Sequence, residues 1–156
     1  MTTTVCRQCN ADTMPLRLGR VEGEDSGVRI TIEGLPALDC SNGHKRFPAP
    51  DFPLEFIQRM LAEEGLISAE PAVQKGLFRK RRLCPGCGEE LPGEEGCSTH
   101  EASISMPDTD PVNVKLSLPM HRCSCGREVT LPKTEVERGV MQAAANAFRA
   151  ADIPPG

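Results

Sequence analysis

The chain has 156 residues, a net charge of −4 and only five aromatic residues, all of them Phe. An acidic chain attracts a phosphate backbone weakly, and so few aromatic rings exclude an extensive base-stacking surface. No apolar run approaches the roughly 18 residues of a membrane span, so no membrane partner is expected.

The amino terminus runs from Met1 to Val5 without a charged region, an apolar core or a cleavage site. We therefore expect no secretory signal and a cytoplasmic location. The chain has eight cysteines, and in a reducing compartment the paired ones are expected to bind metal rather than to form disulfides.

The first predicted element is a tight turn that holds Cys6 and Cys9, which are separated by two residues. A second turn follows some thirty residues later, where Cys40 precedes Gly43 and His44. Gly43 permits a left-handed backbone, and His44 offers an imidazole nitrogen. The spacing predicts one tetrahedral zinc ion on Cys6, Cys9, Cys40 and His44. The alternative for His44 is an exposed turn residue.

Between these turns, the charged stretch 20–27 is predicted to be a hairpin tip. Val28, Ile30 and Ile32 then alternate with polar residues, as in a half-buried strand. A helix is predicted next, with Asp51 as its cap and an apolar stripe that includes Phe56.

This first half resembles the YgiT/MqsA-type zinc ribbon, found as the amino-terminal domain of certain bacterial antitoxins. The similarity rests on the Cys6 to Cys9 pair, the strand 28–32 and the segment Ile32–Cys40. It covers residues 5–47 and, more loosely, 83–130. In that family the ribbon is a folding and protein-contact module, so the resemblance implies contact with a partner protein. The DNA-binding helix-turn-helix domain of the family has no counterpart here, because a second ribbon stands in its place.

A basic linker is expected at residues 66–83, which carry five basic residues and one acidic residue. A helix is one option for this linker. Four of its basic residues are consecutive, namely Arg79, Lys80, Arg81 and Arg82. Such a cluster could contact the phosphates of RNA or DNA, and the alternative is a solvated linker.

The second half begins with Cys84 and Cys87, which follow the first pair by 78 residues, whereas Cys123 follows Cys40 by 83. These spacings indicate a duplicated unit with a second zinc ion on Cys84, Cys87, Cys123 and Cys125. Only one residue separates the last two cysteines, so His121 is a substitute ligand for Cys123. A closed set of four ligands argues against zinc-dependent hydrolysis, because no position is left for water.

Two further residues, Cys97 and His100, lie in the segment 89–110, which is predicted to be a mobile loop. We expect neither of them to bind metal. A separate alternative is thiol redox chemistry at Cys84 and Cys87, which predicts a reactive thiolate in the zinc-loaded protein.

The rest of the second half repeats the pattern of the first. Apolar residues alternate from Val112 to Leu118, as expected for a strand. Thr134 is predicted to begin a helix with a capping box, and an apolar stripe follows it.

The predicted fold is a small, metal-stabilised α+β protein of two zinc ribbons, each followed by a helix. Its units are residues 1–65, the linker 66–83 and residues 84–156. Each unit is too small to fold securely on apolar burial alone, so zinc is expected to be needed for folding. The predicted function is that of a non-enzymatic adaptor or regulatory protein that binds another protein, with nucleic-acid binding and redox chemistry as alternatives. The helices could also mediate a homo-oligomer, and the sequence leaves open whether the two units pack together.

Overall fold

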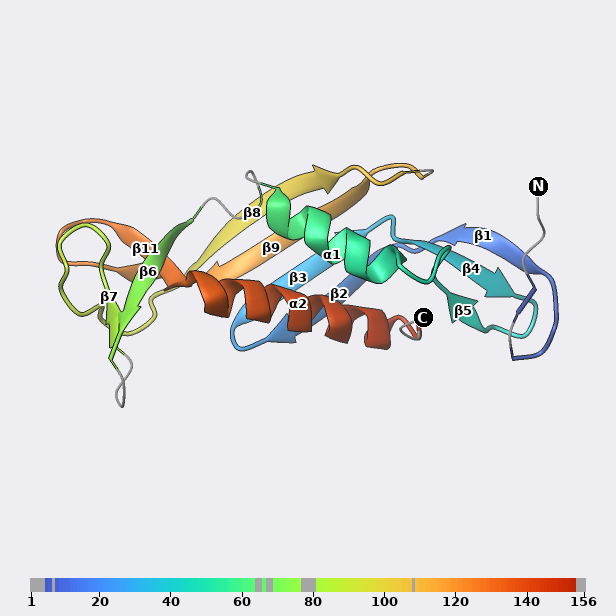
Figure 1. Ribbon diagram of the computed structural model, residues 1–156, viewed down its shortest axis with the longest axis horizontal. Coiled ribbons are helices and arrows are strands. Elements are labelled where there is room, and N and C mark those ends of the chain that lie inside the picture. Colours follow the sequence, from blue (N-terminus) through green and yellow to red (C-terminus); the bar gives the residue numbers. More distant parts are fainter. Residues whose placement is uncertain are drawn as a thin grey trace.

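The computed structural model describes residues 5–6, 8–63, 66, 69–76, 81–107 and 109–153. This part of the chain forms a small α+β protein with three sheets and two helices, which confirms the expected class. Figure 1 shows an elongated molecule in which one sheet and both helices form the middle and a smaller sheet lies at each end. Each end sheet carries one cluster of metal-ligating side chains.

The middle sheet joins the two halves of the chain. Its strands are β2 (Arg20–Asp25), β3 (Val28–Glu33), β9 (Val112–Pro119) and β8 (Cys97–Ile104), in that order and all antiparallel. The two predicted alternating strands are confirmed as β3 and β9, since their apolar side chains are buried on one face of the sheet. Their polar side chains lie on the opposite face, away from the core.

Two segments predicted to lack strands each contain one. The predicted hairpin tip at 20–27 is mostly β2, and only Ser26 and Gly27, with φ of 51° and 84°, form the turn. β8 takes up eight residues of the predicted loop 89–110. Both strands are polar in sequence, and each pairs along its length with a neighbouring strand whose backbone groups need partners.

Both predicted helices are present, as α1 (Phe52–Ala62) and α2 (Lys133–Ala150). Asp51 is the N-cap residue of α1, as predicted, although its side chain makes no cap hydrogen bond. The predicted cap of α2 is wrong, because that helix begins at Lys133, after Pro132, and Thr134 lies inside it. Packing of the apolar stripes therefore matters more to these helices than capping.

Each helix contacts the hairpin that belongs to the other half of the chain. α2 lies on β2 and β3, whereas α1 lies against β8 and α2 (Figure 1). Aromatic rings join the halves, because Phe148 of α2 lies 4.9 Å from Phe47 and 6.4 Å from Phe56, measured between ring centroids. One continuous core therefore spans both halves.

α2 approaches β2 so closely that a side chain would not fit between them. A Cβ atom at Gly23 would lie 2.0 Å from the carbonyl oxygen of Ala143 and 2.5 Å from the backbone nitrogen of Ala147. Glycine on the strand and alanine on the helix thus allow the two backbones to touch.

The end sheets are built from shorter strands. One contains β1 (Thr13–Arg17), β4 (Pro36–Cys40) and β5 (Lys45–Arg46). The other contains β10 (His121–Arg122), β11 (Glu128–Pro132), β6 (Glu70–Lys75) and β7 (Arg81–Leu83), with β6 parallel to β11. The described residues of the basic segment 66–83 thus form strands rather than a helix, because the edge of β11 offers β6 backbone partners.

Candidate metal centres

The first centre is built from two turns that meet at the end of β4. In the first turn, Cys6 N–H donates to the carbonyl of Ala11 at 2.8 Å, and Asn10 N–H donates to the carbonyl of Cys6 at 2.9 Å. In the second, Gly43 N–H donates to the carbonyl of Cys40 at 3.0 Å. Gly43 has a φ of 81°, which confirms the predicted left-handed backbone there. These bonds hold the side chains of both turns toward one another.

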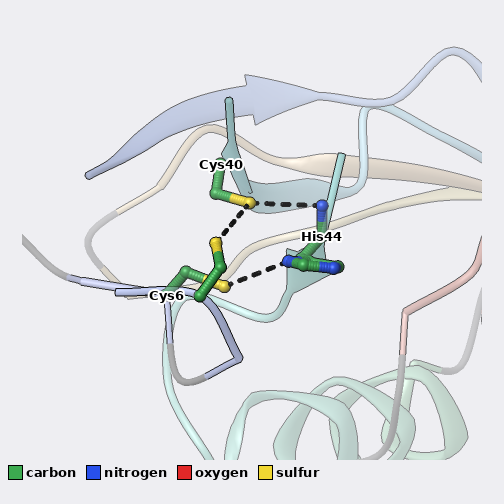
Figure 2. Close-up of side chains that lie close together, drawn as sticks. Cys6, Cys40 and His44 are labelled. Carbon is green, nitrogen blue, oxygen red and sulfur yellow. Dashed lines mark hydrogen bonds between the residues drawn. The ribbon is translucent and has the colours of Figure 1, made fainter. Parts of the chain in front are cut away.

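The four ligand atoms of Cys6, Cys9, Cys40 and His44 all lie within 4.8 Å of one another. Figure 2 shows the side chains of Cys6, Cys40 and His44 gathered around one point. Cys6 Sγ lies 3.5 Å from His44 Nδ1, and Cys9 Sγ lies 3.7 Å from Cys40 Sγ. A tetrahedral zinc ion would separate two sulfurs by about 3.8 Å and a sulfur from a nitrogen by about 3.6 Å. The cluster therefore has the dimensions of such a site and is too wide for a disulfide.

The second centre has the same design at the opposite end of the molecule. The ligand atoms of Cys84, Cys87, Cys123 and Cys125 lie within 4.8 Å of one another. Cys84 Sγ is 3.7 Å from Cys125 Sγ, and Cys87 Sγ is 3.4 Å from Cys123 Sγ. Four cysteine sulfurs at these separations could hold one metal ion.

The turns of the second centre repeat the hydrogen bonds of the first. Gly88 N–H donates to the carbonyl of Cys84 at 2.9 Å, and Gly126 N–H donates to the carbonyl of Cys123 at 2.9 Å. Both glycines have positive φ, 77° and 94°. Cys123 N–H also donates to the carbonyl of Arg127, as Cys40 N–H does to that of His44.

This shared backbone shows where the fourth ligand differs between the centres. Counted from the first cysteine of the turn, His44 corresponds to Arg127, and Asn42 corresponds to Cys125. The fourth ligand thus follows the turn glycine in the first centre and precedes it in the second. The unusual spacing of Cys123 and Cys125 is a consequence of this exchange.

Asn42 and Arg127 have roles that sequence reasoning missed. The Asn42 side chain, followed by the backbone N–H of Ala11 and the ring of His44, lowers the pKa of the Cys9 thiol to about 6. Their signal in the sequence is positional, since each occupies the place of a ligand in the other repeat.

Arg127 compensates charge at the second centre. Four thiolates around a divalent ion leave an excess of negative charge. The pKa of Arg127 is raised first by Glu70, which accepts hydrogen bonds at 3.0 and 3.1 Å, and also by the nearby thiolates of Cys125 and Cys84. A Cβ atom at Gly86 would lie 2.1 Å from Arg127 Nε, so a larger residue there would displace this guanidinium.

Within each centre the thiols differ in acidity. The backbone N–H of Cys87 is the main cause that lowers the pKa of Cys84 to about 7. The pKa of Cys87 is raised to about 12, because the lowering effect of the Glu89 backbone is outweighed by the thiol of Cys123, by burial and by the other two thiols. So many thiols cannot all ionise side by side without a cation between them, and a divalent metal supplies that charge.

The remaining candidate ligands lie outside both clusters. The ring of His121 is buried, and its Nδ1 donates to the carbonyl of Pro92 at 2.7 Å, so His121 does not replace Cys123. Cys97 is exposed on β8, and His100 lies 2.7 Å from the hydroxyl of Ser98. Neither belongs to a cluster of potential ligands among the described residues.

The predicted basic cluster is only partly described. Arg79 and Lys80 lie outside the described residues. Arg81 is exposed in β7, whereas Arg82 lies 3.3 Å from a carboxylate oxygen of Glu135 and 3.8 Å from one of Glu94. Its charge is therefore already opposed by two acidic groups.

Comparison of the chain with protein-family models, with curated proteins and with solved structures finds no match. The class of protein thus rests on the geometry, which defines a small α+β protein with two clusters that could each hold a metal ion. Neither described helix has the length and apolar character needed to cross a membrane.

Proposed function

We propose that the protein is a non-enzymatic zinc-binding adaptor or regulatory protein, built from two zinc ribbons and their helices, that contacts another protein. The observation that carries this proposal is the closed set of four sulfur and nitrogen ligands at each end of the molecule. Tetrahedral sites of this composition are typical of structural zinc and leave no position for a substrate. Zinc would be held there by side chains alone and would supply folding energy.

Duplication accounts for the internal symmetry of the fold. The turns of both centres have the same hydrogen bonds, and the corresponding strands β3 and β9 pair antiparallel. Each helix lies on the hairpin of the other half, as the subunits of an intertwined dimer would. We infer that two ribbon-helix units have joined in one chain. The resemblance to YgiT/MqsA-type ribbons supports contact with a partner protein.

Nucleic-acid binding is the weaker alternative. A non-specific binder needs an extended basic surface, because counterion release supplies most of its affinity. The outward face of the middle sheet instead carries both signs in nearby pairs, such as Arg29 with Glu24 at 3.1 Å and Arg20 with Glu33 at 3.6 Å. The ion pairs of Arg82 with Glu94 and Glu135 also argue against nucleic-acid binding, because they oppose its positive charge.

The experiment is recovery of the tagged chain from its native cells after chemical crosslinking, with and without nuclease. We expect a nuclease-resistant crosslink to another protein, recovered with two zinc ions per chain. A nuclease-sensitive complex would favour the alternative. Binding of the chain to RNA and DNA can then be measured at two salt concentrations. A variant in which residues 79–82 are Ser, compared with the unaltered chain, shows whether that binding depends on the basic cluster. Recovery of the chain without any crosslinked protein would contradict the proposal.

A further inference from the structure

The two outer edges of the middle sheet differ in how they are covered. β2 forms one edge and β8 the other. In an edge strand, alternate residues direct their backbone N–H and C=O away from the neighbouring strand, where another chain could pair with them. Which residues of β8 face outward, and what meets them, decides whether this edge can bind another chain.

The pairing register identifies the outward residues of β8. Cys97 lies opposite Pro119, which has no N–H and therefore cannot exchange two hydrogen bonds with it. Since hydrogen-bonded and non-hydrogen-bonded pairs alternate, Thr99, Glu101 and Ser103 also belong to non-hydrogen-bonded pairs. The backbone groups of these three residues point away from β9, and their side chains are exposed.

The opposite edge, β2, is covered by α2. Asp25 and Val28 close a two-residue turn and form a hydrogen-bonded pair, so the backbone of Glu24 points outward. Asn146 of α2 donates its side-chain N–H to that carbonyl at 2.8 Å. The α2 backbone also covers the neighbouring Gly23. An incoming strand would therefore meet the helix at β2.

No such guard covers β8 in the part of the chain that the structure describes. There, no hydrogen bond reaches the outward backbone groups of Thr99, Glu101 or Ser103. α1 lies against β8, but the hydrogen bond that it makes to this part of the chain comes just beyond the strand, where Arg59 donates to the carbonyl of Ser105 at 3.1 Å. β8 has eight residues and contains neither proline nor a break in register, so it is not protected by short length, by proline or by a bulge.

We propose that the outer edge of β8 binds an extended segment of a partner protein as an added antiparallel strand, with a basic residue opposite Glu101. This inference rests on the proposed function and specifies its contact surface. The three outward residues supply main-chain hydrogen bonds, which give affinity in this mode of recognition. Glu101 supplies the selectivity, because its side chain is 72 % exposed and an opposite charge across a strand pair is stabilising.

A second copy of this chain fits the edge less well. Two antiparallel registers of β8 with itself overlap over seven residues: one would place Glu101 opposite Glu101 of the other copy, where like charges are destabilising, and the other would place it opposite Thr99. β8 has no Lys or Arg, so neither register gives Glu101 an opposite charge. Lys115 lies 4.0 Å from Glu101 on the neighbouring strand, on the side away from the edge, so the other side of the carboxylate faces the incoming strand.

The test uses the full-length zinc-loaded chain and a blocked seven-residue peptide, Val-Thr-Val-Lys-Val-Thr-Val, observed through backbone amide signals in solution NMR. We expect saturable shifts at Thr99, Glu101 and Ser103 at millimolar peptide. The same peptide with a central Glu should bind about fivefold more weakly. E101K should reverse this preference, and the matched charge change E22K on the guarded edge should not alter it.

A second pair of variants tests whether the peptide binds through a main-chain hydrogen bond of β8. S103P removes an outward N–H without breaking the β8–β9 ladder and should abolish peptide binding, while S103V keeps that N–H and should retain it. Should S103P fail to fold, E101K still decides the question. The proposal is overturned if the amides of β8 do not respond while the zinc content and the crosslinked partner persist, whereas loss of zinc or of the partner would count against the proposed function itself. Concentration-dependent dimers with protected β8 amides would overturn it in favour of self-pairing.

Discussion

The exchange of the fourth ligand between the two centres makes a prediction about the first. H44A leaves three thiolates, so the zinc ion must take a water in place of the imidazole. Apparent binding energies of structural zinc are at least roughly 10 kcal/mol for four ligands, so losing one costs about 3 kcal/mol, or about a hundredfold in affinity. We therefore expect zinc to leave this centre first in competition with a chelator.

A second substitution should restore the site. Asn42 occupies the position that Cys125 has in the second centre, on a turn with the same backbone hydrogen bonds. N42C combined with H44A should therefore rebuild a four-ligand site, whereas S41C combined with H44A should not. The unaltered second centre is the internal control.

The assay is zinc transfer to a chelator, supported by cobalt substitution, since the visible spectrum of cobalt reports the number of thiolate ligands. The double variant should bind cobalt with four thiolates at both centres. Two results would contradict this prediction: H44A binds zinc as tightly as the unaltered chain, or S41C restores the site as well as N42C does.

Three further predictions concern packing, charge and pH. G23A should destabilise the fold by about 2 kcal/mol in denaturant unfolding, because its methyl group would enter the α2 backbone. G19A is the control, with no atom within 4 Å of the added methyl, and equal losses would contradict the packing argument. G86A should displace the guanidinium above it and weaken zinc at the second centre about tenfold, leaving the first unchanged; equal affinity in a chelator titration would refute this. Acid should release zinc from both centres, because protons compete for the thiolates. The release should be steeper at the second, where the pKa of Cys87 is about 12 while that of Cys9 at the first is about 6; parallel release curves would contradict this.

The ligands and the main apolar elements could be predicted because their signals are local. Paired cysteines identify both centres, and the alternation around Ile30 and Val114 identifies β3 and β9. The stripes of α1 and α2 are equally periodic. Each of these patterns lies within a short stretch of chain, where spacing alone reports which side chains share a face.

The rest depends on contacts between distant segments. β8 contains no regular apolar alternation, and it is a strand because β9 lies beside it. β6 likewise pairs with β11, some sixty residues away. The helix expected to begin at Thr134 begins at Lys133 instead, since Leu131 before it and Val136 within it are both buried in the same core. Which hairpin each helix covers is a property of the whole fold, and periodicity does not report it.

We propose that two structural zinc ions stabilise the two ends of this protein. The decisive measurement is native mass spectrometry of protein purified without added metal, repeated after denaturation in chelator. We expect two zinc ions per chain, all eight cysteines reduced, and a largely unfolded chain once the metal is removed. One ion, none, or intact disulfides among the eight cysteines would contradict it.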